Sequence, residues 1–131
     1  MAYRLTWYVP AKVLQLQLEG DISASEFAEA NAMIAREIEQ TEGKVALVVD
    51  ASAVTEISSV VSKIKRSQTY SGHPRLGWIF VIGTDKFIRL MMTVIFNVVS
   101  AKMQLFPDHN QMRQFLKPLL GEMGSITYSP N

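Results

Sequence analysis

The chain has 131 residues, no cysteine and a formal net charge of +1. Its length fits one domain of the commonest size, and its hydrophobic content of 48% is too high for a disordered protein. The near-neutral charge argues against electrostatic binding to nucleic acid, and the lack of cysteine excludes disulfides and thiolate catalysis and favours a cytoplasmic location. We therefore expect a single domain over residues 1–131, with a loosely held tail from residue 120 to residue 131.

Two short segments at the start of the chain, Arg4–Val9 and Lys12–Leu18, alternate polar and apolar residues. In the second, glutamines separate Leu14, Leu16 and Leu18. A period of two is typical of strands with one buried face, so these segments predict a hairpin. Neither segment has the continuous apolar stretch of a signal peptide.

A helix is predicted to follow the hairpin. Ser23 and Glu26 have the spacing of a capping box, in which each side chain binds a free backbone N–H of the first turn. The apolar residues beyond them recur at helical spacing and predict the buried side: Phe27, Ala30, Ile34 and Ile38.

The rest of the chain alternates strands and helices. The apolar runs Val45–Val49 and Leu76–Ile82 predict strands that are covered on both faces. A helix beginning near Ser58 or Ser59 lies between them. Further on we expect the helix of residues 86–103, a short strand at Met103–Phe106 and a last helix with apolar residues on one side. The predicted α/β order, β-β-α-β-α-β-α-β-α, implies a mainly parallel sheet after the N-terminal hairpin.

Three motifs in this order resemble the STAS fold of anti-sigma factor antagonists and sulphate transporter tails. They are LQLEGDIS, VVDASAVTEISS and VIGTDKFIRLMM, and the resemblance extends from Tyr3 to Leu119. It implies a regulatory protein-interaction domain in which Ser59 matches the phosphorylated serine and Ser58 precedes it. The acidic residue and glycine of the family motif Asp-Ser-Ser-Gly are absent here, so we expect phosphorylation to be weak or absent. The pattern is therefore more similar to divergent STAS-like proteins related to lipid-binding CRAL-TRIO domains.

The sequence offers little catalytic chemistry. His73 and His109 both lie in predicted loops, where a lone histidine is usually solvated. No phosphate-binding glycine loop or metal-ligand cluster is present in the sequence, so no cofactor or metal is expected. We expect no enzymatic activity.

Three residues, one after a predicted strand and two on a predicted helix, are candidates for binding. Asp50 follows the strand Val45–Val49, where open α/β sheets place ligands, although capping of the next loop is the favoured role. Lys63 and Arg66 lie on the helix after Ser59, either as a solvated face or as a contact for an acidic partner.

The segment KFIRLMMTVIFNVVSAKM, residues 86–103, is interrupted by Arg89 and Asn97, so it is not expected to span a membrane. On a helical wheel, one apolar stripe is expected to pack on the sheet: Phe87, Leu90, Met91, Val94, Val98 and Ala101. A second stripe remains: Ile88, Met92, Phe96, Val99 and Met103.

Three hypotheses account for this second stripe. The last helix covers it, a second copy of the chain binds it, or it lines a pocket for an acyl chain or another apolar small molecule. We expect a homodimeric regulatory module, with apolar-ligand binding as the alternative function.

Overall fold

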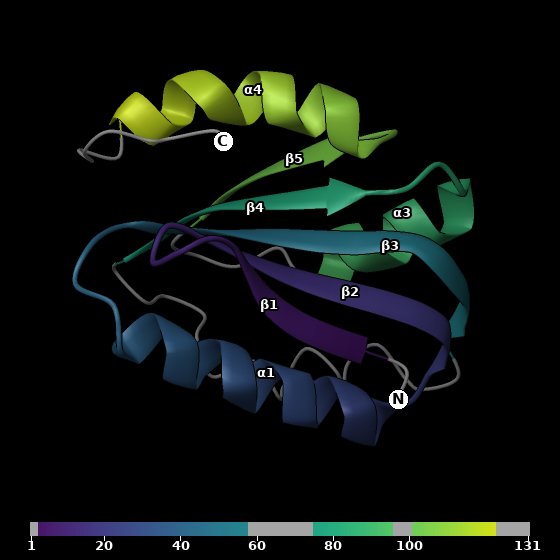
Figure 1. Cartoon of the computed structure of the whole chain (residues 1–131). Coiled ribbons are helices and arrows are strands. Elements are labelled where there is room, and N and C mark those ends of the chain that lie inside the picture. Colours follow the sequence, from purple (N-terminus) through teal and green to yellow (C-terminus); the bar gives the residue numbers. More distant parts are fainter. Residues whose placement is uncertain (1–2, 58–74, 96–100, 123–131) are drawn as a thin grey trace.

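The computed structural model describes residues 3–57, 75–95 and 101–122. Its centre is one five-stranded sheet in the order β1-β2-β3-β4-β5 (Figure 1). β1 (Tyr3–Val9) pairs with β2 (Val13–Ile22) in the antiparallel direction. All later pairs are parallel, through β3 (Val45–Ile57), β4 (Leu76–Ile82) and β5 (Lys102–Phe106). The predicted hairpin and mainly parallel sheet are confirmed.

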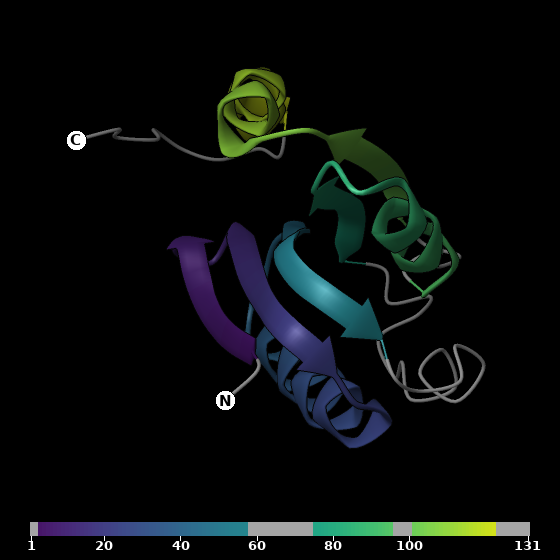
Figure 2. The same ribbon diagram turned by 90° about the vertical axis from the view of Figure 1, so that its right-hand side faces the viewer.

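The helices cover both faces of the sheet. α1 (Ala24–Glu39) and α3 (Lys86–Ile95) contribute to one hydrophobic core, and α4 (His109–Glu122) contributes to a second core on the other face (Figure 2). The described elements follow the predicted order, while the helix expected after Ser59 lies outside the described residues. No helix within the described part of the chain is long and apolar enough to span a membrane.

The capping box predicted for the first helix is present. The Ser23 hydroxyl accepts the Glu26 N–H at 3.2 Å, and Glu26 Oε1 accepts the Ser23 N–H at 3.0 Å. The helix then buries the four predicted apolar residues against the sheet: Phe27, Ala30, Ile34 and Ile38. Local sequence was sufficient here because the cap and the apolar period agree.

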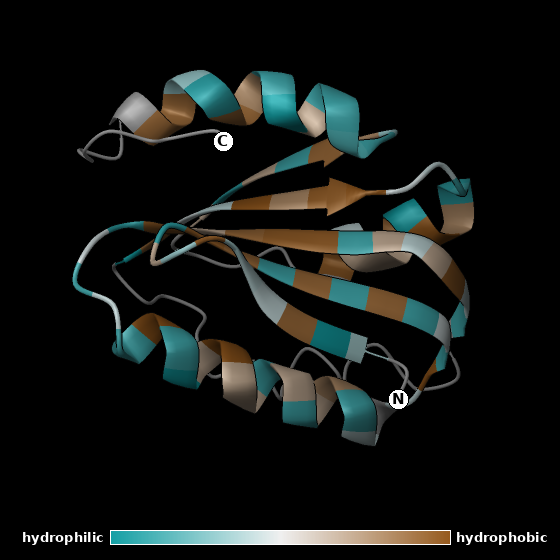
Figure 3. Ribbon diagram, viewed as in Figure 1, coloured by the Kyte–Doolittle hydropathy of each residue, from teal (hydrophilic) through white to brown (hydrophobic). Residues whose placement is uncertain are grey.

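The hairpin has one apolar and one polar face, as its alternation predicts. Leu14, Leu16 and Leu18 are buried in the core beneath α1. The bands of alternating hydropathy are visible along β2 (Figure 3). The opposite face carries Gln15 and Gln17, which are only half-buried. One side of the hairpin therefore remains polar and partly open to solvent.

The third strand is longer than predicted, because it continues to Ile57 instead of ending at Val49. Its pairing with β4 ends at Asp50, and beyond that point β2 is its one partner among the described strands. The register between β2 and β3 shifts after Gln17, so that Glu19 lies opposite Ala53. Such a shift is a β-bulge, which bends a strand and often lies beside a functional site.

The helix after β4 corrects the predicted assignment of its two apolar stripes. Ile88 and Met92 are 5% and 0% exposed and belong to the core shared with α1. Phe87, Leu90 and Val94 instead are exposed to solvent. Apolar residues cover more than half of this helix, so the period could not show which side faces the sheet.

The end of the same segment was also partly misassigned. The described helix ends at Ile95, and Met103 belongs to β5, where it pairs with Ile79. Met103 therefore does not extend a helical stripe. Phe96 and Val99, the other two members of that stripe, lie outside the described residues.

Candidate functional site

Asp50 forms the centre of a compact polar cluster. Its Oδ2 lies 2.7 Å from His109 Nε2, and its Oδ1 accepts the Ser52 hydroxyl at 2.6 Å and the Ser52 N–H at 3.0 Å. The Asp50 side chain is 12% exposed and that of His109 is 33% exposed. Asp50 is the one buried charged residue in the described part of the chain, and buried titratable groups in such clusters are candidates for functional sites.

The fold brings the three residues together from distant segments. Asp50 pairs with Ile82 on β4, and Ile82 pairs with Phe106, the last residue of β5. Asp108 then accepts the Gln111 N–H at 2.9 Å as a helix cap, so His109 begins α4 directly above this row. Ser52 lies within the register shift between β2 and β3, and its N–H bonds to the Asp50 side chain.

Burial raises the pKa of the Asp50 carboxyl, but other contacts oppose it. Hydrogen bonds from the Ser52 hydroxyl, from His109 and from the Ser52 N–H lower the pKa, as does the charge of His109. The net result is a pKa below the ordinary value of an aspartate. Asp50 is therefore an ionised acceptor at neutral pH.

The order of contacts in this cluster differs from that of a catalytic triad. In a serine hydrolase the histidine lies between the serine and the aspartate and accepts the hydroxyl proton. Here Asp50 lies between Ser52 and His109, and the Ser52 hydroxyl donates to the carboxylate. The arrangement holds Ser52 and His109 on the same carboxylate, and the only base it offers Ser52 is that carboxylate, whose lowered pKa makes it a weak one. Within the described residues, no group of acidic or histidine side chains has the geometry of a metal site.

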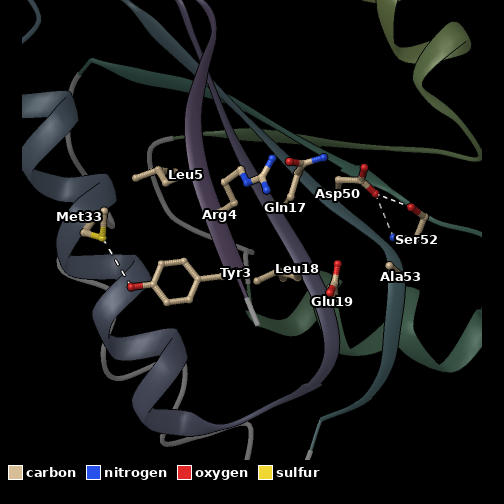
Figure 4. A pocket seen from close by; sticks show the side chains of 10 residues that line it. All are labelled: Tyr3, Arg4, Leu5, Gln17, Leu18, Glu19, Met33, Asp50, Ser52 and Ala53. Carbon is tan, nitrogen blue, oxygen red and sulfur yellow. Dashed lines mark hydrogen bonds between the residues drawn. The ribbon is translucent and has the colours of Figure 1, made fainter. Parts of the chain in front are cut away.

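A cavity of about 570 Å³ opens beside this cluster (Figure 4). Arg4, Gln17 and Asp50 form a row across three adjacent strands, because Arg4 pairs with Gln17 and Gln17 pairs with Asp50. The remaining lining residues are Tyr3, Leu5, Leu18, Glu19, Met33, Ser52 and Ala53. The described lining carries charges of both signs, from Arg4, Glu19 and Asp50.

A second candidate surface is the exposed apolar side of α3. Phe87, Leu90 and Val94 are 63%, 59% and 43% exposed. Their spacing of three and four residues places them on one side of the helix. We call these three residues the α3 stripe. Large apolar side chains grouped in this way commonly mark a contact with another molecule.

The sequence matches the SpoIIAA-like family over residues 13–117. The chain belongs to the SpoIIAA-like family. No curated protein matches it in sequence.

Two solved structures support the same fold. An uncharacterised protein from Shewanella loihica with a SpoIIAA-like fold has a TM-score of 0.62 and 10% identity, covering 88% of this chain and 92% of that one. The anti-sigma factor antagonist SpoIIAA in its unphosphorylated form has a TM-score of 0.55 and 12% identity, covering 88% of this chain and 99% of that one. At these identities the comparison establishes the fold, and the predicted STAS-like fold is confirmed.

The structure locates some of the predicted site residues of this SpoIIAA-like domain. Asp50 lies inside β3, where it binds Ser52 within the bulge instead of ending a strand. Ile88 and Met92 lie in the core shared with α1, so among the three hypotheses for their stripe these two residues make an intramolecular contact, with the sheet and not with the last helix. Four further candidates lie outside the described residues: Ser58, Ser59, Lys63 and Arg66.

His109 is the residue that the sequence reasoning missed. It was expected to be a solvated loop histidine, but it begins a helix and contacts a buried carboxylate. The run Pro107-Asp108 was the available indication, because an aspartate after a strand often caps a new helix. Its partner lies 59 residues earlier in the chain and could not be inferred from spacing.

Proposed function

We propose that this SpoIIAA-like domain is a non-enzymatic regulatory module that acts by binding protein through the α3 stripe. The exposure of Phe87, Leu90 and Val94 is the observation that carries the proposal. Ile88 and Met92, on the other side of the same helix, hold α3 on the sheet. A firmly held helix with an outward apolar side loses little conformational freedom on binding, which favours association.

A second copy of the chain is the first partner to consider. Contact between two copies of the α3 stripe around a twofold axis would bring the same apolar residues together and remove them from water. The aromatic ring of Phe87 is of the type enriched in the centres of interfaces. The same surface also fits an apolar patch on a different regulatory protein.

The family membership and the missing cysteine support a regulatory role in the cytoplasm. Ser59 and the basic residues Lys63 and Arg66 belong to this proposal as a partner surface, with weak or absent phosphorylation of Ser59. The Asp50 cluster supports the non-enzymatic part, because its Ser52 hydroxyl donates to a carboxylate of lowered pKa, which is a weak base, and not to the histidine.

Sedimentation velocity of the wild type and of Leu90→Lys tests the proposal. Leu90 is exposed, so the lysine should leave the circular dichroism spectrum unchanged while it weakens self-association. Met33→Lys is the matched control, because Met33 is also an exposed apolar helix residue but lies on α1. The Kd of a stable dimer lies far below roughly 100 µM. A wild type that is monomeric at this concentration would therefore rule out the homodimer.

The contact with another protein is tested separately by cross-linking in cells with a photoreactive amino acid at position 90 or position 33. Adducts specific to position 90 are expected. Equal adducts at the two positions, or none at position 90, would contradict binding through the α3 stripe. Apolar-ligand binding beside this helix, the alternative function, would appear instead as discrete added mass in native mass spectrometry.

A further inference from the structure

A groove of about 350 Å³ lies between the first strand and the last helix, away from α3. Its floor consists of the Tyr8 side chain and two buried leucines, Leu116 and Leu120. Its rim consists of four exposed side chains of α4: Asn110, Arg113, Gln114 and Lys117. The volume is near the lower end of the range for small-molecule sites, about 300–1,000 Å³.

The charged residues described around this groove all have the same sign. Arg113 and Lys117 line it, and none of the described residues around it is acidic. The two cations are four residues apart on one helix, a spacing that brings them together and makes their repulsion unfavourable. Neither forms an ion pair with another described residue. A bound anion would relieve this repulsion and accept hydrogen bonds from both side chains.

The remaining rim residues fit the same ligand. Asn110 and Gln114 are also one turn apart, and their amide groups donate hydrogen bonds without adding negative charge. The floor supplies an aromatic ring and aliphatic surface, and both leucines are held in the core that includes Val13 and Phe80. An apolar body is therefore expected beneath the charged head.

We propose that this groove binds a small organic anion, with its carboxylate between Arg113 and Lys117 and its apolar body over Tyr8, Leu116 and Leu120. The site is separate from the α3 stripe and goes beyond the proposed protein-binding function. Because β1 and α4 both line the groove, a bound anion would connect the edge of the sheet to the last helix.

Titration with octanoate, followed by amide chemical shifts, tests the proposal. The largest shifts are expected at Tyr8 and over residues 110–117. Octanol lacks the carboxylate, and acetate lacks the long alkyl chain. Each should therefore bind at least about tenfold more weakly than octanoate. Equal binding of octanol, or shifts centred on the cavity beside Asp50, would overturn the proposal.

The variant Arg113→Gln with Lys117→Gln should weaken octanoate binding by at least about tenfold, since both charge-assisted contacts are lost. The matched control, Arg36→Gln with Lys86→Gln, removes the same charge from exposed positions on α1 and α3 and should bind octanoate as the wild type does. Unchanged affinity in the first variant would contradict the assignment. The side chains are exposed, so both variants should give folded spectra.

Discussion

The Asp50 carboxylate and the His109 imidazole join the centre of the sheet to the first residue of α4 across 2.7 Å. Asp50 also fixes the bulge of β3 through two bonds to Ser52. One buried carboxylate thus contacts both the bulge of β3 and the first residue of the last helix, which Asp108 caps. A buried acceptor with three donors is costly to disturb, because each donor loses its partner when the charge is removed.

Asp50→Asn should destabilise the protein by about 1–3 kcal/mol at pH 7, since the charged acceptor is lost while the shape of the side chain is retained. The lowered pKa of Asp50 means that its contribution is complete above the unfolded-state value of about 3.9. That contribution is lost as the pH falls through the folded-state pKa. Urea unfolding from pH 7 to pH 3 should show the difference between wild type and variant shrinking below about pH 4. A constant difference across this range would contradict the assignment.

A double-mutant cycle of Asp50→Asn and His109→Gln measures the contact between the two side chains. Residues in direct contact typically show coupling energies of about 0.5–3 kcal/mol, so the two changes together should cost less than their sum. Urea denaturation of the four proteins gives this value. The control cycle pairs Asp50→Asn with Gln104→Ala, an exposed residue of β5, and should be additive. A cycle that is additive for His109 would show that the contact contributes no coupling.

The two sides of α3 should respond differently to truncation. Met92→Ala should cost about 2–5 kcal/mol, because Met92 is fully buried and its loss leaves a cavity. Leu90→Ala should stay within about 0.5 kcal/mol, because Leu90 is exposed. Thermal unfolding of both variants at concentrations where the protein is monomeric checks the orientation of the helix. Equal losses would mean that the helix is rotated relative to the structure described.

Alanine substitutions at two glycines measure the cost of backbone strain, because both sites have room for a Cβ and only one has a left-handed backbone. Gly20 has a φ of +72°, and a Cβ added there would meet no atom within 4 Å. Gly20→Ala should therefore cost about 1–2 kcal/mol from left-handed backbone strain alone. Gly77 is equally open but does not have a left-handed φ, so Gly77→Ala should be neutral or stabilising by up to about 1 kcal/mol. Chemical denaturation of the pair tests this difference, and equal effects would argue against strain at Gly20.

The sequence by itself determined the elements whose local patterns agree with their tertiary environment. The capping box of Ser23 and Glu26 located the start of α1, and the helical period of its apolar residues identified the buried side. The leucines of β2 likewise identified one buried face, because alternation has only two possible phases and the polar residues occupied the other. Each of these features depends on residues a few positions apart.

Only the tertiary structure decided which side of α3 is buried and what Asp50 contacts. Apolar residues surround most of α3, so its period alone does not distinguish Ile88 and Met92, which lie in the core, from the exposed side. Asp50 and His109 are 59 residues apart and meet only because β3, β4 and β5 are aligned in register. Local sequence encodes the period and the ends of an element, whereas contacts between distant elements depend on how the whole sheet is assembled.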